Sequence, residues 1–186
     1  MAIESPQYEL VSKEGKFEIR EYAEHLVAEV ELEADYDSAI NKGFAILADY
    51  IFGNNVTRAH IKMTAPVTEQ KVSSEKIDMT APVAVSEVST GKKYRVTFSM
   101  PSKYNLETLP QPNNKAINIR KVNKHKVAVL RFSGNLNLKL ADIEANEFSR
   151  LLQIKNLEPK AGFIFALYNP PWIPGPFKHD EIMVDL

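Results

Sequence analysis

Over most of its length, the sequence alternates between apolar and polar residues with a period of two. The clearest run covers residues 26–33, where apolar residues alternate with Val27 and three glutamates. Because successive side chains of a strand point to opposite faces, each run predicts a half-buried β-strand. Further runs occur at 17–19, 61–67, 77–85, 94–100, 117–119, 127–129, 163–167 and 182–186.

Two segments depart from this period and instead repeat apolar residues at steps of three and four, which is typical of an amphipathic helix. The first starts near Asp35 or Asp37, either of which can cap a helix by accepting from the free amides of its first turn. Gly53 is the expected stop, because helices often end on a residue with positive φ. The second helix is predicted from about Lys139 to Gln153.

The order of these elements repeats along the chain. Ile19-Arg20 returns as Ile119-Arg120 and Val27-Ala28 returns as Val127-Ala128, both at an offset of 100. In each half, two strands precede one helix and further strands follow it. Two such halves are expected to merge their strands into one curved antiparallel sheet or barrel-like body with both helices packed on it. The default ligand site is then the concave face or the groove between helix and sheet.

A shorter repeat is more specific. The segment 62–67, Lys-Met-Thr-Ala-Pro-Val, recurs at 78–83 as Asp-Met-Thr-Ala-Pro-Val. Proline has no amide hydrogen to donate to a neighbouring strand, so both copies are expected at an edge, a bulge or a strand end.

Composition excludes several classes of protein. The 186 residues suit a single domain, and 23 Lys+Arg against 24 Asp+Glu give a net charge of −1, which disfavours nucleic-acid binding. Without cysteine there is no disulfide, thiolate metal site or cysteine nucleophile. Neither a secretory signal nor an apolar stretch long enough to span a membrane is recognised. A soluble, cytoplasmic protein is expected.

Catalytic and metal-binding signatures are not found. The four histidines lie far apart in sequence and are interpreted as surface or edge residues, without an i, i+4 pair to hold a metal. Glu29, Glu31 and Glu33 are interpreted as a solvated strand face. Glu18 and Glu21 beside Arg20 are interpreted as ordinary surface ion pairing. No catalytic residue and no metal ligand is therefore predicted.

The C-terminal stretch 168–177 has four prolines and a glycine, which predicts a stiff loop. It carries Trp172, Ile173 and Phe177, and Lys178 follows directly. Exposed large apolar groups usually indicate a partner or a ligand. A lid packed permanently over its own sheet is the alternative.

Several segments together resemble the SOUL/haem-binding protein family, and the resemblance covers nearly the whole chain. They are Tyr8–Leu10, Phe17–Tyr22, Asp37–Phe44, Ile61–Val67, Tyr168–Pro171 and Asp180–Ile182. The resemblance implies one domain over 1–186 with a pseudo-twofold α+β fold: two βαβ-type repeats, about 8–100 and 115–186, form a distorted antiparallel barrel flanked by two helices.

The resemblance also implies binding of haem or another porphyrin, through a largely hydrophobic surface near the first helix and the Pro-rich loop. The candidate apolar wall is Ile40, Phe44, Leu47, Trp172, Ile173 and Phe177. The candidate cations for the porphyrin carboxylates are Lys42, Arg58, Lys62 and Lys178. Some members of the family have a proposed axial histidine at the position of Glu21, so that mode of iron ligation is not expected here.

Non-enzymatic tetrapyrrole binding is thus the first functional hypothesis. An enzyme on the same scaffold, which removes iron from haem or hydrolyses an apolar small molecule, is the second. It requires a buried carboxylate with a raised pKa in the pocket, and Glu21 and Glu181 are the candidates. A module that binds another hydrophobic ligand, or a partner protein through the Pro-rich loop, is the third.

Overall fold

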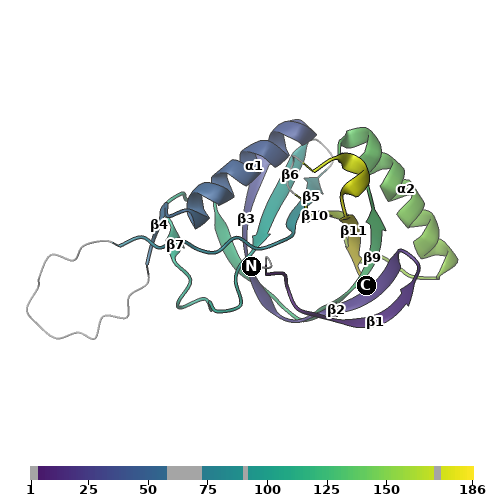
Figure 1. Cartoon of the computed structure of the whole chain (residues 1–186), viewed down its shortest axis with the longest axis horizontal. Coiled ribbons are helices and arrows are strands. Elements are labelled where there is room, and N and C mark those ends of the chain that lie inside the picture. Colours follow the sequence, from purple (N-terminus) through teal and green to yellow (C-terminus); the bar gives the residue numbers. More distant parts are fainter. Residues whose placement is uncertain (1–3, 58–72, 90–91, 170–172) are drawn as a thin grey trace, which may run out of the picture.

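The computed structural model of the chain describes residues 4–57, 73–89, 92–169 and 173–186. These residues form strands, two long helices and one short 3-10 helix, which Figure 1 labels. In chain order they are β1 (Tyr8–Glu14), β2 (Phe17–Tyr22), β3 (His25–Glu33), α1 (Tyr36–Ile51), β4 (Asn55–Val56), β5 (Val83–Ser89), β6 (Lys93–Ser99), β7 (Gln111–Pro112), β8 (Asn118–Val122), β9 (His125–Phe132), α2 (Leu138–Ile154), β10 (Ile164–Leu167), η1 (Gly175–Phe177) and β11 (Asp180–Asp185).

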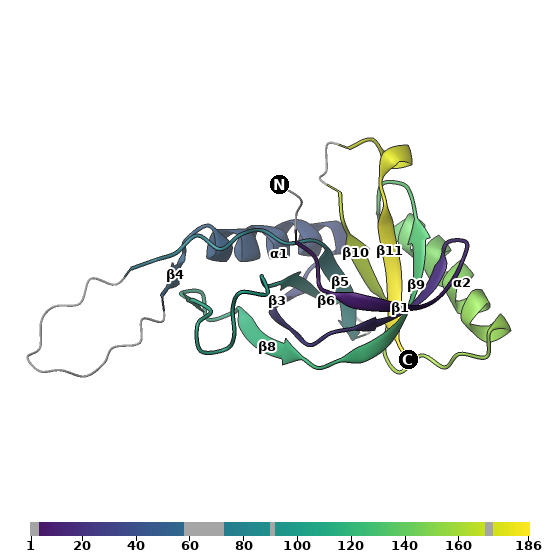
Figure 2. The same cartoon turned by 60° about the horizontal axis from the view of Figure 1, so that its bottom comes forward.

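Within the described residues, nine strands form one antiparallel sheet in the order β1-β2-β9-β11-β10-β5-β6-β3-β8. The sheet curls into a half-barrel, and both long helices lie along its outer side (Figures 1 and 2). Helix α1 packs against β3 and β6, and α2 contacts β11. The predicted α+β class, with a curved antiparallel sheet flanked by two helices, is confirmed.

The strand order is balanced about the middle of the sheet. Strands β10 and β5 are neighbours at its centre, followed outward by β11 and β6, then β9 and β3, then β2 and β8. The two halves of the chain interleave, because β2 pairs with β9 and β3 pairs with β8. A duplicated chain would give this order, and the pseudo-twofold relation between the halves stays a prediction.

The period of two assigns each strand residue to a face. Ala28 and Val30 of β3, with Val96 and Phe98 of β6, belong to the main core between the sheet and the helices. The intervening residues, such as Val27, point to the face that the helices leave uncovered. A second, smaller buried cluster lies on that open face and consists of Tyr22, Val127, Val129, Ala166 and Met183.

The helix ends agree with the signals in the sequence. Asp35 caps α1 by accepting a hydrogen bond from the amide of Ser38 at 3.0 Å, and Asn137 caps α2 in the same way. After α1, Gly53 takes a positive φ of 122°. Within the described residues, neither helix has the length and apolar character needed to cross a membrane.

One predicted strand is shorter than expected. The alternation at 77–85 predicts a strand over the whole range, but β5 begins at Val83. Pro82 directly precedes it, at the strand end expected for this proline. Ile77 is buried instead under the end of α1, where its amide donates to a helix carbonyl at 2.8 Å. The first copy of the repeat, 62–67, lies outside the described residues.

The close approach of α1 to β6 can be tested at Gly43. A Cβ added there would lie 2.4 Å from Cγ2 of Val96, so Gly43→Ala must displace the helix from the sheet. We expect the free energy of unfolding, measured by urea denaturation, to fall by about 1–3 kcal/mol. Gly162→Ala is the control, because nothing lies within 4 Å of its Cβ position. Equal effects of the two substitutions would contradict the packing.

Candidate functional site

Two hollows of the described structure meet at the open side of the sheet. The first, which we call the trough, has a volume of about 430 Å³ and includes Tyr22, His125 and Met183 in its lining. The second, the outer hollow, has about 530 Å³ and is bounded by the segments 4–7, 23–26 and 99–107. His25 lines both. Volumes of this size are typical of small-molecule sites.

The trough has an apolar floor to which strands of both halves of the chain contribute. One apolar residue comes from each of four strands: Val27 from β3, Val127 from β9, Ile164 from β10 and Met183 from β11. Because side chains alternate between the two faces of a strand, these four point away from the helices. Met183 is adaptable in shape, as methionine generally is at binding surfaces. The floor can therefore contact the face of a flat apolar molecule.

Two histidines line the trough close together. His25 is the first residue of β3 and His125 is the first residue of β9, and their ring centroids are 6.3 Å apart. Tyr22 pairs with His125 in the β2–β9 register, and its ring stacks on that imidazole at 5.9 Å and 21°. The three rings form an aromatic cluster where the two halves of the chain meet.

The chain fixes which nitrogen of each imidazole is available. Nδ1 of His25 lies 2.9 Å from the carbonyl oxygen of Ala23, and Nδ1 of His125 lies 2.8 Å from that of Asn123. A carbonyl oxygen can only accept, so Nδ1 carries the proton and the lone pair of the neutral ring is on Nε2. Nε2 of His125 faces Asp185 at 3.6 Å. Among the described residues, none is bonded to Nε2 of His25.

The environment of His25 favours the neutral imidazole. Burial lowers the pKa of His25, and the hydrogen bond to Ala23, which acts in the opposite direction, does not restore it. The neighbouring His125 and Arg120 lower it further. At neutral pH, His25 is therefore a neutral ring with a lone pair to donate.

Basic side chains surround the histidines. Those that line the trough are Arg95, Arg120, Lys121 and Lys124. Their partners are Glu31, Glu29, Glu24 and Glu21, respectively. Exposed ion pairs such as Lys121–Glu24 and Lys124–Glu21 are worth about 0–1 kcal/mol each, so an anionic ligand can compete for these two lysines at little cost. Asp185 is the only acidic residue among the described residues that line the trough.

Arg20, expected at the surface, is buried. It is 1% exposed, and its Nη atoms donate to Glu181 at 2.8 and 2.6 Å while Nε donates to Glu18 at 2.7 Å. The ring of Tyr8 covers the guanidinium at 4.4 Å. The prediction of a surface ion pair is wrong, because proximity in sequence could not show that β1 covers this arginine and that β11 supplies a second carboxylate.

The interpretation of Glu29 as part of a solvated strand face is also wrong. Glu29 is 6% exposed and accepts hydrogen bonds from Arg120 at 2.9 Å and from Asn118 at 3.2 Å. The expected solvated face is present only at Glu31 and Glu33, which are exposed. Strand β8, which pairs with β3 at this point, supplies the groups that cover Glu29.

The buried network around Arg20 reaches the aromatic cluster. Nη1 of Arg20 donates to the hydroxyl of Tyr22 at 3.0 Å, and the hydroxyl of Tyr168 donates to Glu181 at 3.0 Å. Burial raises the pKa of both tyrosines, so they remain protonated donors and acceptors at neutral pH. The network thereby fixes the ring of Tyr22 beside His125.

The two carboxylates that the enzyme hypothesis requires are both paired. Glu181 is buried beside Tyr168, but its oxygens accept from Arg20 and, at 3.3 Å, from Arg131. Glu21 forms an ion pair with Lys124 at 2.8 Å. Neither carboxylate is among the residues that line the two hollows.

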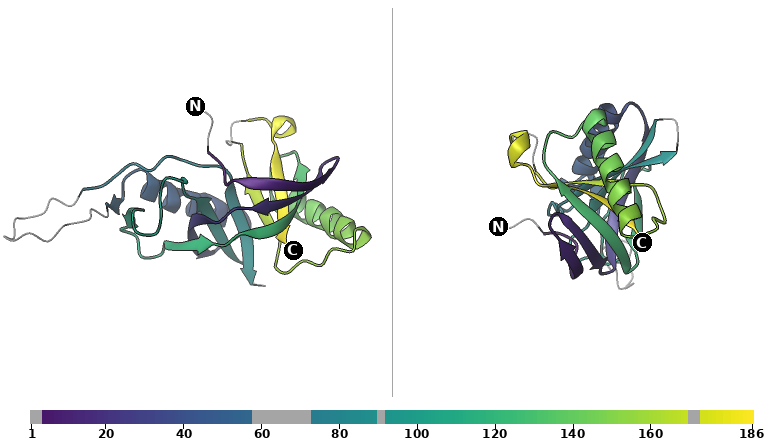
Figure 3. Two further views of the ribbon diagram at one scale, coloured as in Figure 1. Left: turned by 90° about the horizontal axis from the view of Figure 1, so that it is seen from below. Right: turned by 90° about the vertical axis from the view of Figure 1, so that its right-hand side faces the viewer.

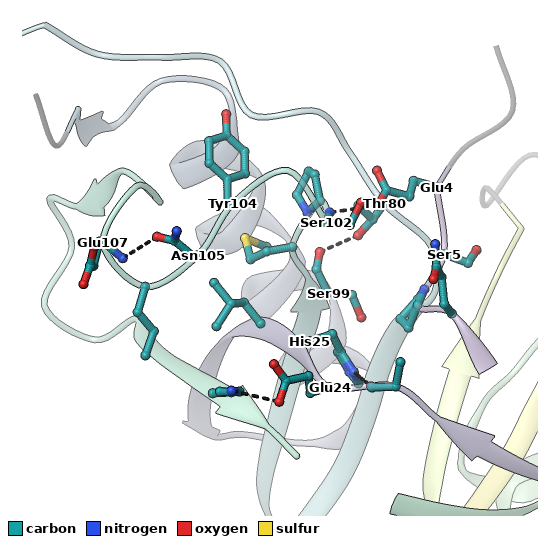
Figure 4. A pocket seen from close by; sticks show the side chains of 18 residues that line it. Glu4, Ser5, Glu24, His25, Thr80, Ser99, Ser102, Tyr104, Asn105 and Glu107 are labelled. Atoms are coloured by element: carbon teal, nitrogen blue, oxygen red, sulfur yellow. Dashed lines mark hydrogen bonds and ion pairs between the residues drawn. The ribbon is translucent and has the colours of Figure 1, made fainter. Parts of the chain in front are cut away.

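The outer hollow differs in charge from the trough. Its lining includes the carboxylates of Glu4, Glu24 and Glu107. Glu4 accepts from the amide of Ser102 at 2.8 Å, and Figure 4 shows this pair across the hollow from Glu24 and His25. His25 thus stands between a hollow with several carboxylates and a trough lined mainly by basic and apolar groups.

Four of the predicted site residues lie on α1. Lys42 is exposed and Ile40 is half-buried. Phe44 is 39% exposed and packs edge-on against Phe98 at 5.4 Å. Leu47 is fully buried in the core, so it could support a ligand surface on this helix only from beneath.

The described part of the Pro-rich loop packs near the start of α2. The carbonyl of Gly175 accepts from the amide of Gly134 at 3.0 Å. Ile173 and Lys178 are half-buried, and Phe177 is 71% exposed. The remaining predicted site residues, Arg58, Lys62 and Trp172, lie outside the described residues.

The predicted site residues on α1 and those of the Pro-rich loop are not joined directly in the described structure. Among the residues described, no hydrogen bond or ring contact links the predicted residues of α1 to those of segment 173–178. That they form one ligand surface stays a prediction. Sequence reasoning passed over His25 and His125, although the offset of 100 that relates the two halves also relates these histidines.

The residues at the trough fit a haem iron better than a bare metal ion. Within the described parts of the chain, there is no group of three or more metal-ligating side chains that could hold an ion. A porphyrin already supplies four nitrogens, so its iron needs only one or two protein ligands, and imidazole is a common one. The neutral His25 meets that requirement.

Comparison with known proteins identifies the class to which this fold and site belong. Residues 3–185 match the family model of the SOUL heme-binding protein. The chain belongs to the SOUL heme-binding protein family, as the sequence resemblance predicts. A 55-residue stretch is 47% identical to human heme-binding protein 2, and it covers 29% of this chain and 27% of that protein. The match thus spans about a quarter of this curated relative.

Solved structures share the fold over nearly the whole chain. A protein described as a hydrolase from Listeria innocua has a TM-score of 0.55 at 14% identity, with 94% of this chain and 93% of that chain covered. The C-terminal domain of EcmrR has a TM-score of 0.61 at 9% identity, with 96% of both chains covered. At such identities the likeness shows the fold alone.

The buried network is tested by Glu181→Ala, which leaves Arg20 with one of its two buried carboxylates. We expect the free energy of unfolding to fall by about 3–5 kcal/mol in urea denaturation at pH 7. Glu31→Ala, which removes a carboxylate from a partly exposed pair on the same face of the sheet, is the control and should cost at most about 1 kcal/mol. A Glu181→Ala protein as stable as this control would refute a structural role for the network.

Proposed function

We propose that this protein binds haem or a related tetrapyrrole without catalysing a reaction on it. The observation that carries the proposal is the family match over residues 3–185. The name of the human relative, heme-binding protein 2, supports the same class of ligand. The trough is the surface of the described structure that best suits such a molecule.

The shape and lining of the trough support this choice. A tetrapyrrole is a flat apolar disc, and Val27, Val127, Ile164 and Met183 offer an apolar floor. Val27, Val127 and Met183 are already buried, so the apolar surface removed from water on binding is mainly that of the disc, at about 2.5 kcal/mol per 100 Å². The basic groups around the trough suit the carboxylates at the edge of the disc.

The pairing of the two candidate carboxylates supports a non-enzymatic role. A general acid or base needs a proton-transfer group that faces the ligand. Glu181 is committed to Arg20 and Arg131, and Glu21 to Lys124. Both candidate carboxylates of the enzyme hypothesis are therefore already paired with cations.

The surface predicted from the sequence is a second candidate for the ligand site. Phe177 is 71% exposed, Phe44 is 39% exposed, and Lys42 is an exposed residue of the same helix as Phe44. Exposed aromatic groups with nearby cations suit a porphyrin edge. The same exposure of Phe177 keeps open the alternative that the Pro-rich loop binds a partner protein.

The ligand class is tested by titration of the purified protein with ferric haem and, in parallel, with iron-free protoporphyrin. We expect a saturable change in absorption or fluorescence at micromolar protein, because the apolar face of the disc becomes buried. If neither ligand gives such a change, the proposed function is wrong.

The location is tested by Thr97→Trp, which places a large side chain in the trough from β6. We expect the dissociation constant of protoporphyrin, measured by fluorescence, to rise at least about tenfold because the hollow is filled. Phe52→Ala is the control, because Phe52 is exposed and belongs to neither candidate site, and it should leave the dissociation constant unchanged. If only Phe177→Ala weakens the binding of protoporphyrin, the ligand binds at the second surface and not in the trough.

A further inference from the structure

We propose that Nε2 of His25 is the ligand of the iron when the tetrapyrrole is haem, so that the protein prefers haem over the iron-free porphyrin. The inference rests on the proposed function and deepens it. It assigns iron ligation to a residue outside the position, Glu21, at which some members of the family have their proposed axial histidine.

The side chain of His25 is oriented for this role. The hydrogen bond from Nδ1 to the carbonyl of Ala23, at 2.9 Å, holds the ring and leaves the lone pair on Nε2. Histidines that bind metals usually donate their other ring N–H to a carbonyl or carboxylate in this way. The ring lines the trough beside Tyr22, with ring centroids 6.5 Å apart.

The charge state of His25 agrees with the role. Burial of the ring lowers the pKa of His25 most, the hydrogen bond to the carbonyl of Ala23 raises it in part, and the neighbouring His125 and Arg120 lower it further. A neutral imidazole can donate its lone pair to ferric iron in one coordination bond, with no proton to displace and no change in oxidation state.

His125 is less suited to ligate iron, although it lies 6.3 Å away and has the same local geometry. Its Nδ1 donates to the carbonyl of Asn123, and its Nε2 lies 3.6 Å from the carboxylate of Asp185, a charged neighbour that Nε2 of His25 does not have within the described residues. It also lies under the stacked ring of Tyr22. Of the two histidines, only His25 is therefore expected to bind the iron.

The experiment compares absorption spectra and affinities for ferric haem among the wild type, His25→Ala, His125→Ala and His179→Ala. We expect the wild-type complex to show the spectrum of imidazole-ligated ferric haem. His25→Ala should lose that spectrum and bind haem at least about tenfold more weakly, which corresponds to about 1.4 kcal/mol, while its affinity for protoporphyrin stays the same. Millimolar free imidazole should restore the wild-type spectrum.

The other two variants are controls, one within the trough and one at an exposed histidine beyond it. Both should keep the imidazole-ligated spectrum. His25→Met serves if the alanine variant folds poorly, since a thioether keeps a ligand at the same place and should give a different, methionine-type spectrum.

The outcomes separate the inference from the proposed function. If the wild type binds haem and protoporphyrin equally, or if His25→Ala keeps the wild-type spectrum and haem affinity, His25 is not the ligand although tetrapyrrole binding stands. Loss of the spectrum in His125→Ala alone would assign the iron to the other histidine and also overturn the inference. If neither ligand binds the wild type, both proposals are wrong.

Discussion

Arg20 has its positive charge inside the protein, and the rest of the open face is arranged around it. The guanidinium on β2 reaches past β9 to a carboxylate on β11 and is covered by Tyr8 of β1. A buried charge of this kind is tolerated only when it is paired and fully hydrogen-bonded. The same group donates to Tyr22, so the pairing that neutralises Arg20 also sets the ring that stacks on His125.

The division of the sheet into two faces explains how one chain provides both stability and a ligand surface. In the described residues, the face under α1 and α2 is packed with apolar side chains that form the main core. The apolar cluster that the open face buries is small, and the curl of the sheet leaves hollows beside it. Function is thus expected where the helices do not reach, because a ligand there displaces water and not core side chains.

The sequence predicted the elements better than the site. The alternation at 26–33 and the cap at Asp35 are local signals, and both are reproduced in β3 and α1. The environment of Glu18 could not be predicted locally, because the groups that bury it come from other strands. The strand expected at 77–85 failed in its first part for a similar reason: Ile77 found apolar neighbours under the end of α1. The meeting of His25 with His125 required the strand order, which no local pattern contains.

By itself, the sequence determined most of the strands and both long helices and which strand positions are apolar, and it predicted that the order of elements occurs twice. These follow from the periods of two and 3.6 and from capping chemistry, which act between residues close in the chain. Only the tertiary structure decided that the two halves interleave, that Arg20 and Glu181 are buried together, and that two histidines 100 residues apart share one trough. The reason is that burial and pairing depend on which strands become neighbours, and neighbours in a sheet are chosen by the packing of the whole chain.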